Sequence, residues 1–236
     1  LVAAIVLGPR RGFPKTPMLP HNMTMTATGA GLLWVGWFGF NGGSALAANG
    51  NAAMAMLVTH ISASMGAITW AAIEWKKFGK PSALGIVTGM VAGLGSITPA
   101  SGFVGPGGAL IIGLCGGFVC FHATVYIKHT LKIDDSLDVF PVHGVGGILG
   151  TLLVGVFSST ELGAFSGYGY GEGNETMLDQ LLVQATGVGA TIVYTAVVSF
   201  VLFKVVALMT DGLRVDEEQE IQGLDISQHE ETGYSL

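Results

Sequence analysis

The sequence predicts an all-α, polytopic membrane protein built as a bundle of transmembrane helices. Half of its 236 residues are hydrophobic and only 11% are charged, and its mean hydropathy is strongly positive. Soluble domains do not have this composition. Glycine occurs 37 times, which suits membrane helices that approach one another closely. Apolar runs as long as a bilayer is thick recur along the chain, so we expect several spans rather than one.

The first residues are too short to form a span of their own. Residues 1–8, LVAAIVLG, are all apolar or small, but eight residues cannot cross a bilayer and nothing basic precedes them as in a signal peptide. We therefore expect them to be the end of a transmembrane helix whose beginning is missing. Residues 9–22 are basic and rich in turn-forming residues, which predicts a cytoplasmic loop.

The region 23–210 is expected to contain six complete spans. The apolar runs lie at about 23–46, 50–75, 82–98, 107–128, 139–157 and 178–210. Lys and Arg cluster before the first run and after the second, fourth and sixth. The connections without Lys or Arg are 46–50, 98–107 and 158–177. Because positive charge marks the cytoplasmic side, this alternation places the carboxyl terminus in the cytoplasm.

The acidity of the chain belongs mostly to its tail. The formal net charge is −6, and eight of the sixteen acidic residues lie in the last 26 residues. Residues 211–236 are therefore predicted to form an acidic cytoplasmic tail.

Two helix faces carry glycine at helical spacing. Gly85, Gly89 and Gly93 recur at every fourth residue of the third span, and Gly113 and Gly117 repeat the pattern in the fourth. Faces without side chains allow helix backbones to approach closely in a membrane. We expect both faces to be helix contacts.

The fifth span contains one ionisable side chain, His143, within DVFPVHGVGGILGTLLVGVF. Polar groups inside a membrane are energetically costly, and they normally face a cavity, a partner or a transport path. One interpretation makes His143 a pore residue. In the other, a neighbouring helix satisfies it, because Gly144, Gly146 and Gly147 beside it indicate close backbone contact.

The first span places aromatic and polar side chains together. Trp37, Phe40, Asn41 and Ser44 recur at i, i+3, i+4 and i+7, so they share a helix face. Aromatic faces attract cations, and a hydroxyl can accept a hydrogen bond from an N–H donor. The face could therefore line a ligand path, although aromatic residues in a membrane helix also serve packing or an interfacial belt.

No enzymatic or metal-binding pattern accompanies these residues. The sequence contains no HExxH motif, no Cys/His cluster, no GxSxG elbow and no phosphate-binding loop. We therefore expect neither catalysis nor a metal or other cofactor, and no nucleic-acid partner.

Five longer stretches of the sequence are GWFGFNGGSALAAN, GKPSALG, TPASGFVGPGGALIIG, IDDSLDVFPVHGVGGILG and GLRVDEEQEIQGLDISQHEE. Together they resemble the Amt/Mep/Rh family of ammonium transporters, and most closely its bacterial and archaeal Amt type. The resemblance extends through all 236 residues. It implies eleven transmembrane helices in two inverted halves of five plus a final helix, and a homotrimer in the plasma membrane, surrounded by lipid, with one pore per subunit. This chain would begin within the fifth helix.

The resemblance also implies roles for individual residues. His143 matches a pore histidine that relays protons, and Phe40 matches a phenylalanine of the outer gate. Ser44 matches the hydroxyl that recruits ammonium, and Trp37 matches a pore-lining tryptophan. Ammonium would be recruited by cation–π contacts and a hydroxyl, lose a proton near the gate and pass as ammonia through a dry channel that excludes bare cations.

Other implications concern the cytoplasmic side. Asp135 and Asp138 match structural acids near the pore, and the tail matches one that packs against the cytoplasmic face, couples subunits and can meet a PII-family regulatory protein. The family's partner histidine, second gate phenylalanine and recruitment tryptophan belong to a half that is absent here, so the chain holds half a pore. His60 matches no functional histidine of the family.

Two other functions remain open at this stage. The same fold could act as an ammonium sensor that signals to a cytoplasmic partner, an interpretation that a signalling domain fused after the tail would favour. A gas or water channel of the Rh type is the second alternative, which Ser44 and the Amt-like tail disfavour.

Overall fold

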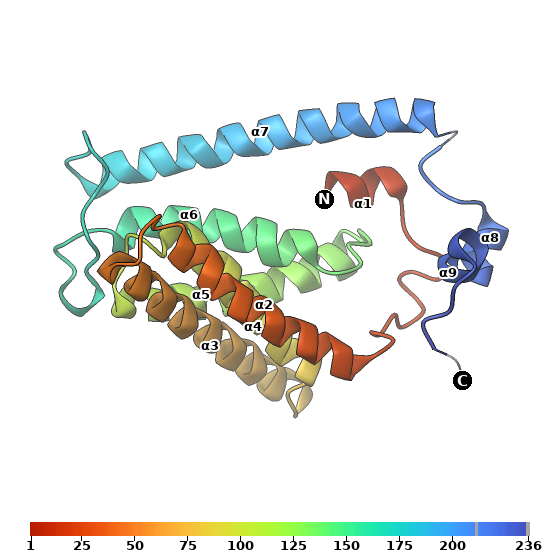
Figure 1. Ribbon diagram of the computed structural model, residues 1–236, viewed down its shortest axis with the longest axis horizontal. Coiled ribbons are helices and arrows are strands. Elements are labelled where there is room, and N and C mark those ends of the chain that lie inside the picture. The colour runs from red at the N-terminus through yellow and green to blue at the C-terminus, as the bar shows by residue number, and fades with distance from the viewer. Residues whose placement is uncertain (211, 235–236) are drawn as a thin grey trace.

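The computed structural model describes residues 1–210 and 212–234, which form helices joined by loops (Figure 1). The longer helices are α2 (Met23–Gly43), α3 (Gly50–Phe78), α4 (Ala83–Ile97), α5 (Pro106–Val125), α6 (Val145–Phe157) and α7 (Met177–Met209). The short helices are α1 (Val2–Leu7), α8 (Glu217–Gln222) and α9 (Leu224–His229). The predicted all-α class is confirmed. Of the expected tail, Asp211, Ser235 and Leu236 lie outside the described residues.

Among the described residues, five helices are long and apolar enough to cross a membrane. With the turns that continue them, they cover Gly50–Phe78, Ala83–Ala100, Pro106–Thr130, Phe140–Phe157 and Met177–Met209, close to five of the six expected spans. The remaining expected span corresponds to α2, which is helical over 21 residues but is not one of these five helices. Its polar residues include Thr24, Thr26, Thr28 and Asn41.

Side-chain caps fix where four of the longer helices begin. The N-cap residues of α2, α3, α4 and α7 are Asn22, Asn49, Ser82 and Thr176. Each accepts hydrogen bonds from backbone amides of the first turn, at 2.8 to 3.2 Å, which satisfies donors that a helix start otherwise leaves free. The connections between α2, α3 and α4 are short, so these helices run antiparallel to one another.

The predicted glycine faces are contacts with α3, which is confirmed in the structure. A Cβ atom added to Gly93 would overlap the carbonyl oxygen of Ser62, and one added to Gly89 would overlap the carbonyl oxygen of Gly66. From the other side, a Cβ at Gly117 would lie 2.7 Å from the Gly66 oxygen. The Ser62 hydroxyl also donates to the Gly93 carbonyl at 2.8 Å. The α3 backbone is thus held between α4 and α5 by residues without side chains.

The helices give the molecule two distinct ends (Figure 1). We call the end beside α8 and α9 the tail end, and the opposite end, which carries the loop 158–176, the far end. α7 runs along α6 from the far end back toward the tail, and Gln180 is the only buried residue within it. α2 and α6 both start at the tail end and run toward the far end. Phe40 and Ser44 therefore lie nearer the far end than the start of α2.

Candidate functional site

The end of α2 presents an aromatic face with a hydroxyl beside it. The rings of Trp37 and Phe40 meet edge to face, with centroids 6.1 Å apart. The Ser44 hydroxyl donates to the Phe40 carbonyl at 2.7 Å, which leaves its oxygen free to accept. Phe40 is 62% exposed. Asn41 differs from the expectation, because it is buried and its amide donates to the Thr59 hydroxyl at 2.9 Å. It therefore secures α2 against α3.

Trp37 is fixed in orientation and faces His143. Its indole N–H donates to the Thr98 hydroxyl at 2.7 Å, and that hydroxyl donates to the Leu94 carbonyl, also at 2.7 Å. The indole and the His143 imidazole lie nearly parallel, with ring centroids 6.3 Å apart and planes at 17°. The structure thus brings together Trp37 from the first expected span and His143 from the fifth, which are far apart in the sequence.

His143 lies in a widened helical turn. Residues Phe140–Gly144 form a π-helical turn, η3, that leads directly into α6. Asp135 caps this segment, because its carboxylate accepts from the backbone amides of Val139 at 3.1 Å and Phe140 at 2.6 Å. Wide turns of this kind occur often at functional sites. Asp135 therefore anchors the start of the helix on which His143 is carried.

A cavity of about 330 Å³ opens beside the imidazole. It is lined by Trp37, Gly95, Thr98, Pro99, His143, Gly147 and Thr151. The His143 side chain makes no hydrogen bond to any described side chain or backbone group. Of the neighbouring glycines, Gly146 contacts α4 and α5 through Ser96 and Cys120, whereas Gly147 faces open space. Close packing thus occurs on one face of the helix, while the histidine faces the cavity.

A second hollow of about 560 Å³ adjoins the same tryptophan. Its lining is almost wholly apolar and consists of Gly29, Leu32, Leu33, Gly36, Trp37 and Phe40. Trp37 is common to both hollows, so the aromatic face of α2 borders the histidine cavity. His60 belongs to neither. Its ring lies against Trp34 and Phe38, with centroids 5.2 and 6.0 Å away.

Two aspartates on either side of Asp135, Asp134 and Asp138, bind cations at the tail end. Arg10 donates to Asp134 from its backbone amide and from two guanidinium nitrogens, each at 2.8 Å. The hydrogen bonds from Arg10 hold the pKa of Asp134 below its ordinary value. Asp138, in the left-handed region at φ 55°, pairs with the Lys128 ammonium at 2.8 Å. Burial raises the pKa of the Asp138 carboxyl, and Lys128 partly opposes that effect.

The sign of the Asp134 shift determines when its ion pair contributes to stability. A carboxyl whose pKa is lowered in the folded protein stabilises the fold at any pH above its unfolded pKa. That contribution disappears only as the pH falls through the lowered folded value. The link between Arg10 and Asp134 is therefore complete throughout the neutral range.

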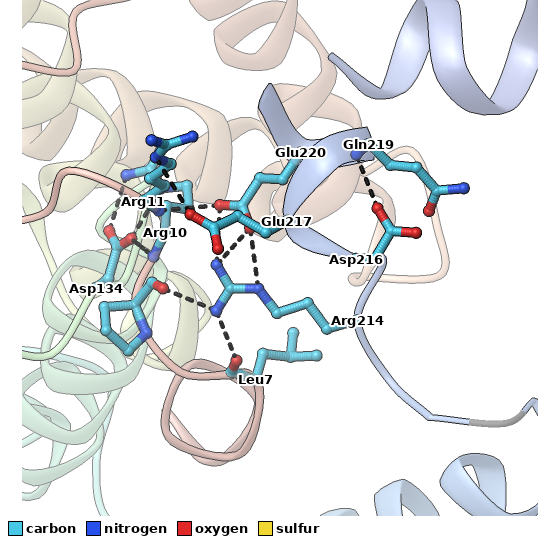
Figure 2. A network of polar contacts seen from close by, with 10 residues as sticks. Leu7, Arg10, Arg11, Asp134, Arg214, Asp216, Glu217, Gln219 and Glu220 are labelled. Atoms are coloured by element: carbon cyan, nitrogen blue, oxygen red, sulfur yellow. Dashed lines mark hydrogen bonds and ion pairs between the residues drawn. The ribbon is translucent and has the colours of Figure 1, made fainter. Parts of the chain in front are cut away.

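The acidic tail packs against the residues that follow α1 (Figure 2). The Arg214 guanidinium donates to both oxygens of Glu220, at 2.7 and 2.8 Å, and to the carbonyls of Leu7 and Pro9. The backbone amide of Arg11 donates to Glu220 at 2.9 Å. The hydrogen bonds from Arg11 and Arg214 lower the pKa of Glu220. This network, which we call the tail clamp, joins the tail to the loop 9–22.

Three residues make contacts that the sequence does not predict. Thr98 lies in a connection between two expected spans, Arg10 is one of the cations of the loop 9–22, and Glu74 lies near the end of the second apolar run. In the structure Glu74 accepts from the Ser82 amide at 2.7 Å and so closes the turn between α3 and α4. No local motif signals such contacts, because each depends on residues from a different helix or turn.

The fold defines the chain as a multi-pass membrane protein, and one open hollow in it is lined by aromatic and polar side chains. The Ammonium Transporter Family matches residues 1–234, and the chain belongs to that family. It is 45% identical to "Ammonium transporter Amt1" of Archaeoglobus fulgidus over 236 residues, which are all of this chain and 58% of that relative. It is 42% identical to the "Ammonium transporter" of Bacillus subtilis, covering 99% of this chain and 56% of that one.

Solved structures show the same fold. A structure titled "Sensor Amt Protein" superimposes with a TM-score of 0.85 at 32% identity, covering 96% of this chain and 55% of that one. Saccharomyces cerevisiae Mep2 superimposes with a TM-score of 0.80 at 34% identity, covering 92% and 51%. The chain therefore spans about half the length of the relatives it matches, between 48% and 58% of each. The resemblance to the Amt/Mep/Rh family that the motifs indicated is confirmed.

Proposed function

We propose that the polypeptide carrying these residues transports ammonium or ammonia across the cell membrane. The observation that carries the proposal is the cavity in which Trp37 and His143 lie face to face, next to Phe40 and Ser44. The relatives are named as ammonium transporters, and the arrangement here suits a cation that can lose a proton. The potassium ion cannot lose a proton, and it is the competing cation that a selective transporter has to exclude.

The residues present support a sequence of three steps. Ammonium meets the exposed ring of Phe40 and the free lone pairs of Ser44 at the far end, where cation–π attraction and a hydroxyl acceptor recruit it. It loses a proton near Phe40, because a bare cation is strongly disfavoured in an apolar passage. Ammonia then passes Trp37 and reaches the imidazole of His143, whose ordinary pKa near neutrality suits proton relay.

The orientation and assembly belong to the same proposal. Positive residues lie at the tail end of α3 and in the loop 9–22, so the tail end is assigned to the cytoplasm and the far end to the outside. The apolar, unburied surface of α7 suits lipid or a further protein surface. We assign the working unit to a homotrimer with one path per subunit, and the tail end to contact with a PII-family regulator.

Uptake by proteoliposomes tests the function directly. The natural polypeptide that carries these 236 residues is reconstituted, and labelled methylammonium uptake is measured beside rubidium uptake, which reports potassium-like leakage. Methylammonium uptake well above that of empty vesicles, competed by ammonium and without rubidium uptake, is the expected result. Equal passage of both cations, or uptake no faster than in empty vesicles, contradicts transport of this kind.

The tail clamp should influence the rate of transport. Deleting Leu213–Leu236, or replacing Arg214 with alanine, removes the hydrogen bonds to Glu220 and to the loop carbonyls. The same loop carries Arg10, which binds Asp134 next to the cap of the helix that contains His143. Loss of the tail hydrogen bonds is therefore expected to change the position of that helix start as well. We expect uptake to fall about fivefold or more, in the range of ordinary coupling between sites, with normal membrane insertion.

The matched control for the tail is Lys15→Ala, which removes an exposed cation of the same loop. The Lys15 side chain makes no ion pair with any described residue. Uptake rates are compared at equal amounts of protein recovered from the membrane. If Arg214→Ala and the deletion both transport at the rate of Lys15→Ala, the tail clamp has no part in transport.

Ammonium sensing is the second candidate function. One observation favours it, because a solved structure with the same fold at 32% identity is titled "Sensor Amt Protein". A sensor binds ammonium without moving it at a useful rate. Saturable ammonium binding in vesicles that show no uptake would therefore favour sensing over transport.

A further inference from the structure

One wall of the histidine cavity is formed by a single face of the helix that contains α6. His143, Gly147 and Thr151 lie four residues apart, so they follow one another along the same face. All three line the cavity. At 1.5 Å per residue, Thr151 stands about 12 Å from His143 along the helix axis, toward the far end.

The hydroxyl of Thr151 has no hydrogen-bond partner among the described residues, unlike that of Thr98. Thr98 donates to the Leu94 carbonyl and accepts from Trp37, both at 2.7 Å, so its proton and one lone pair are in use. The Thr151 hydroxyl makes no hydrogen bond within the described part of the chain, not even to the carbonyl four residues earlier. It can therefore both donate and accept inside the cavity.

The space between the His143 imidazole and the Thr151 hydroxyl is open. A Cβ atom added to Gly147 would meet no atom within 4 Å, and one added to Gly95 on the opposite wall would come no closer than 3.6 Å to any atom. The rest of the lining is largely apolar. A small neutral amine that crosses this stretch therefore meets the imidazole, the Thr151 hydroxyl and the remaining lone pair of Thr98, and of the two hydroxyls it is that of Thr151 that can donate to the amine.

We infer that Thr151 is a substrate contact, which offers ammonia a second hydrogen-bonding group on the far-end side of His143. The inference rests on the proposed function. The ammonia nitrogen can accept from the hydroxyl through its lone pair, or, in the other orientation, an N–H of ammonia can donate to the hydroxyl oxygen. A polar molecule in an apolar passage loses its hydrogen bonds to water, and a hydroxyl partway along restores one of them. Thr151 thus shortens the stretch that ammonia crosses without a partner.

Thr151→Val tests the contact of Thr151 with ammonia, because valine keeps the shape of threonine and lacks the hydroxyl. In proteoliposomes containing the whole natural polypeptide, we expect the maximal rate of methylammonium uptake to fall about tenfold, the effect of losing one buried hydrogen bond in the rate-limiting passage. The half-saturating concentration should stay unchanged, because Phe40 and Ser44 at the recruiting end are untouched. Thr151→Ser, which keeps the hydroxyl, should retain most of the rate.

The outcomes separate this inference from the function on which it rests. If wild type takes up no methylammonium, the proposed function fails. If wild type is active and Thr151→Val matches it in maximal rate, Thr151 is not a contact and only this inference is overturned. If Thr151→Val is not recovered from the membrane, Thr151→Ser and Thr151→Ala make the same comparison, because they differ only in the hydroxyl. Equal rates for that pair overturn the inference as well.

Discussion

Replacing His143 with alanine is expected to remove selective uptake of methylammonium. The imidazole faces a cavity and has no hydrogen-bond partner among the described residues, so its loss leaves no buried polar group unsatisfied in the surrounding helices. The change is thus confined to the path itself. We expect uptake to fall at least tenfold, or the path to admit rubidium, because the group that accepts and relays a proton is gone.

His60→Ala is the matched control for His143→Ala. His60 also lies inside a helix long enough to span a membrane, but its ring contacts Trp34 and Phe38 and lines neither hollow. Uptake of methylammonium and rubidium is compared at equal protein content. If His143→Ala takes up methylammonium at the unchanged rate and still excludes rubidium, His143 has a packing role. The sensor function would then be favoured.

The sequence predicts the helices well because their signals are local. Apolar runs of bilayer length, side-chain caps and glycine turns all act within a few residues of the chain. The exception is α2, which contains several threonines and an asparagine and is not one of the five helices long and apolar enough to cross a membrane. Helical periodicity placed Trp37, Phe40 and Ser44 on one face, yet it could not show that Asn41 is drawn into the contact with Thr59. That outcome depends on the neighbouring helix.

The contacts of the candidate site are only partly predictable for the same reason. A histidine in an apolar run indicates a functional or packed position, but the facing indole of Trp37 comes from a helix about a hundred residues away. Thr98 orients that indole through a hydrogen bond that only the packed structure reveals. The tail clamp likewise joins Arg214 to the carbonyls of Leu7 and Pro9, at the other end of the sequence. Such long-range pairs leave no local pattern.

Gly93→Ala is expected to destabilise the folded protein. The added methyl group would overlap the Ser62 carbonyl, which is part of the α3 backbone and cannot rotate away. α3 and α4 would have to separate, which would also break the 2.8 Å hydrogen bond from the Ser62 hydroxyl to the Gly93 carbonyl. Overpacking of this kind costs about 1 to 3 kcal/mol or more. We expect a Tm in detergent lower by several degrees and a smaller yield of folded protein.

Gly187→Ala provides the control, since it makes the same chemical change on α7, where an added Cβ meets no atom within 4 Å. Alanine also has the higher helix propensity, so this variant should be as stable as wild type or slightly more stable. Thermal unfolding in detergent, followed by size-exclusion chromatography, compares the two variants. If Gly93→Ala melts at the same temperature as Gly187→Ala, the close contact of α3 with α4 does not hold the bundle together. The glycine spacing would then serve another purpose than packing, such as the width of the path.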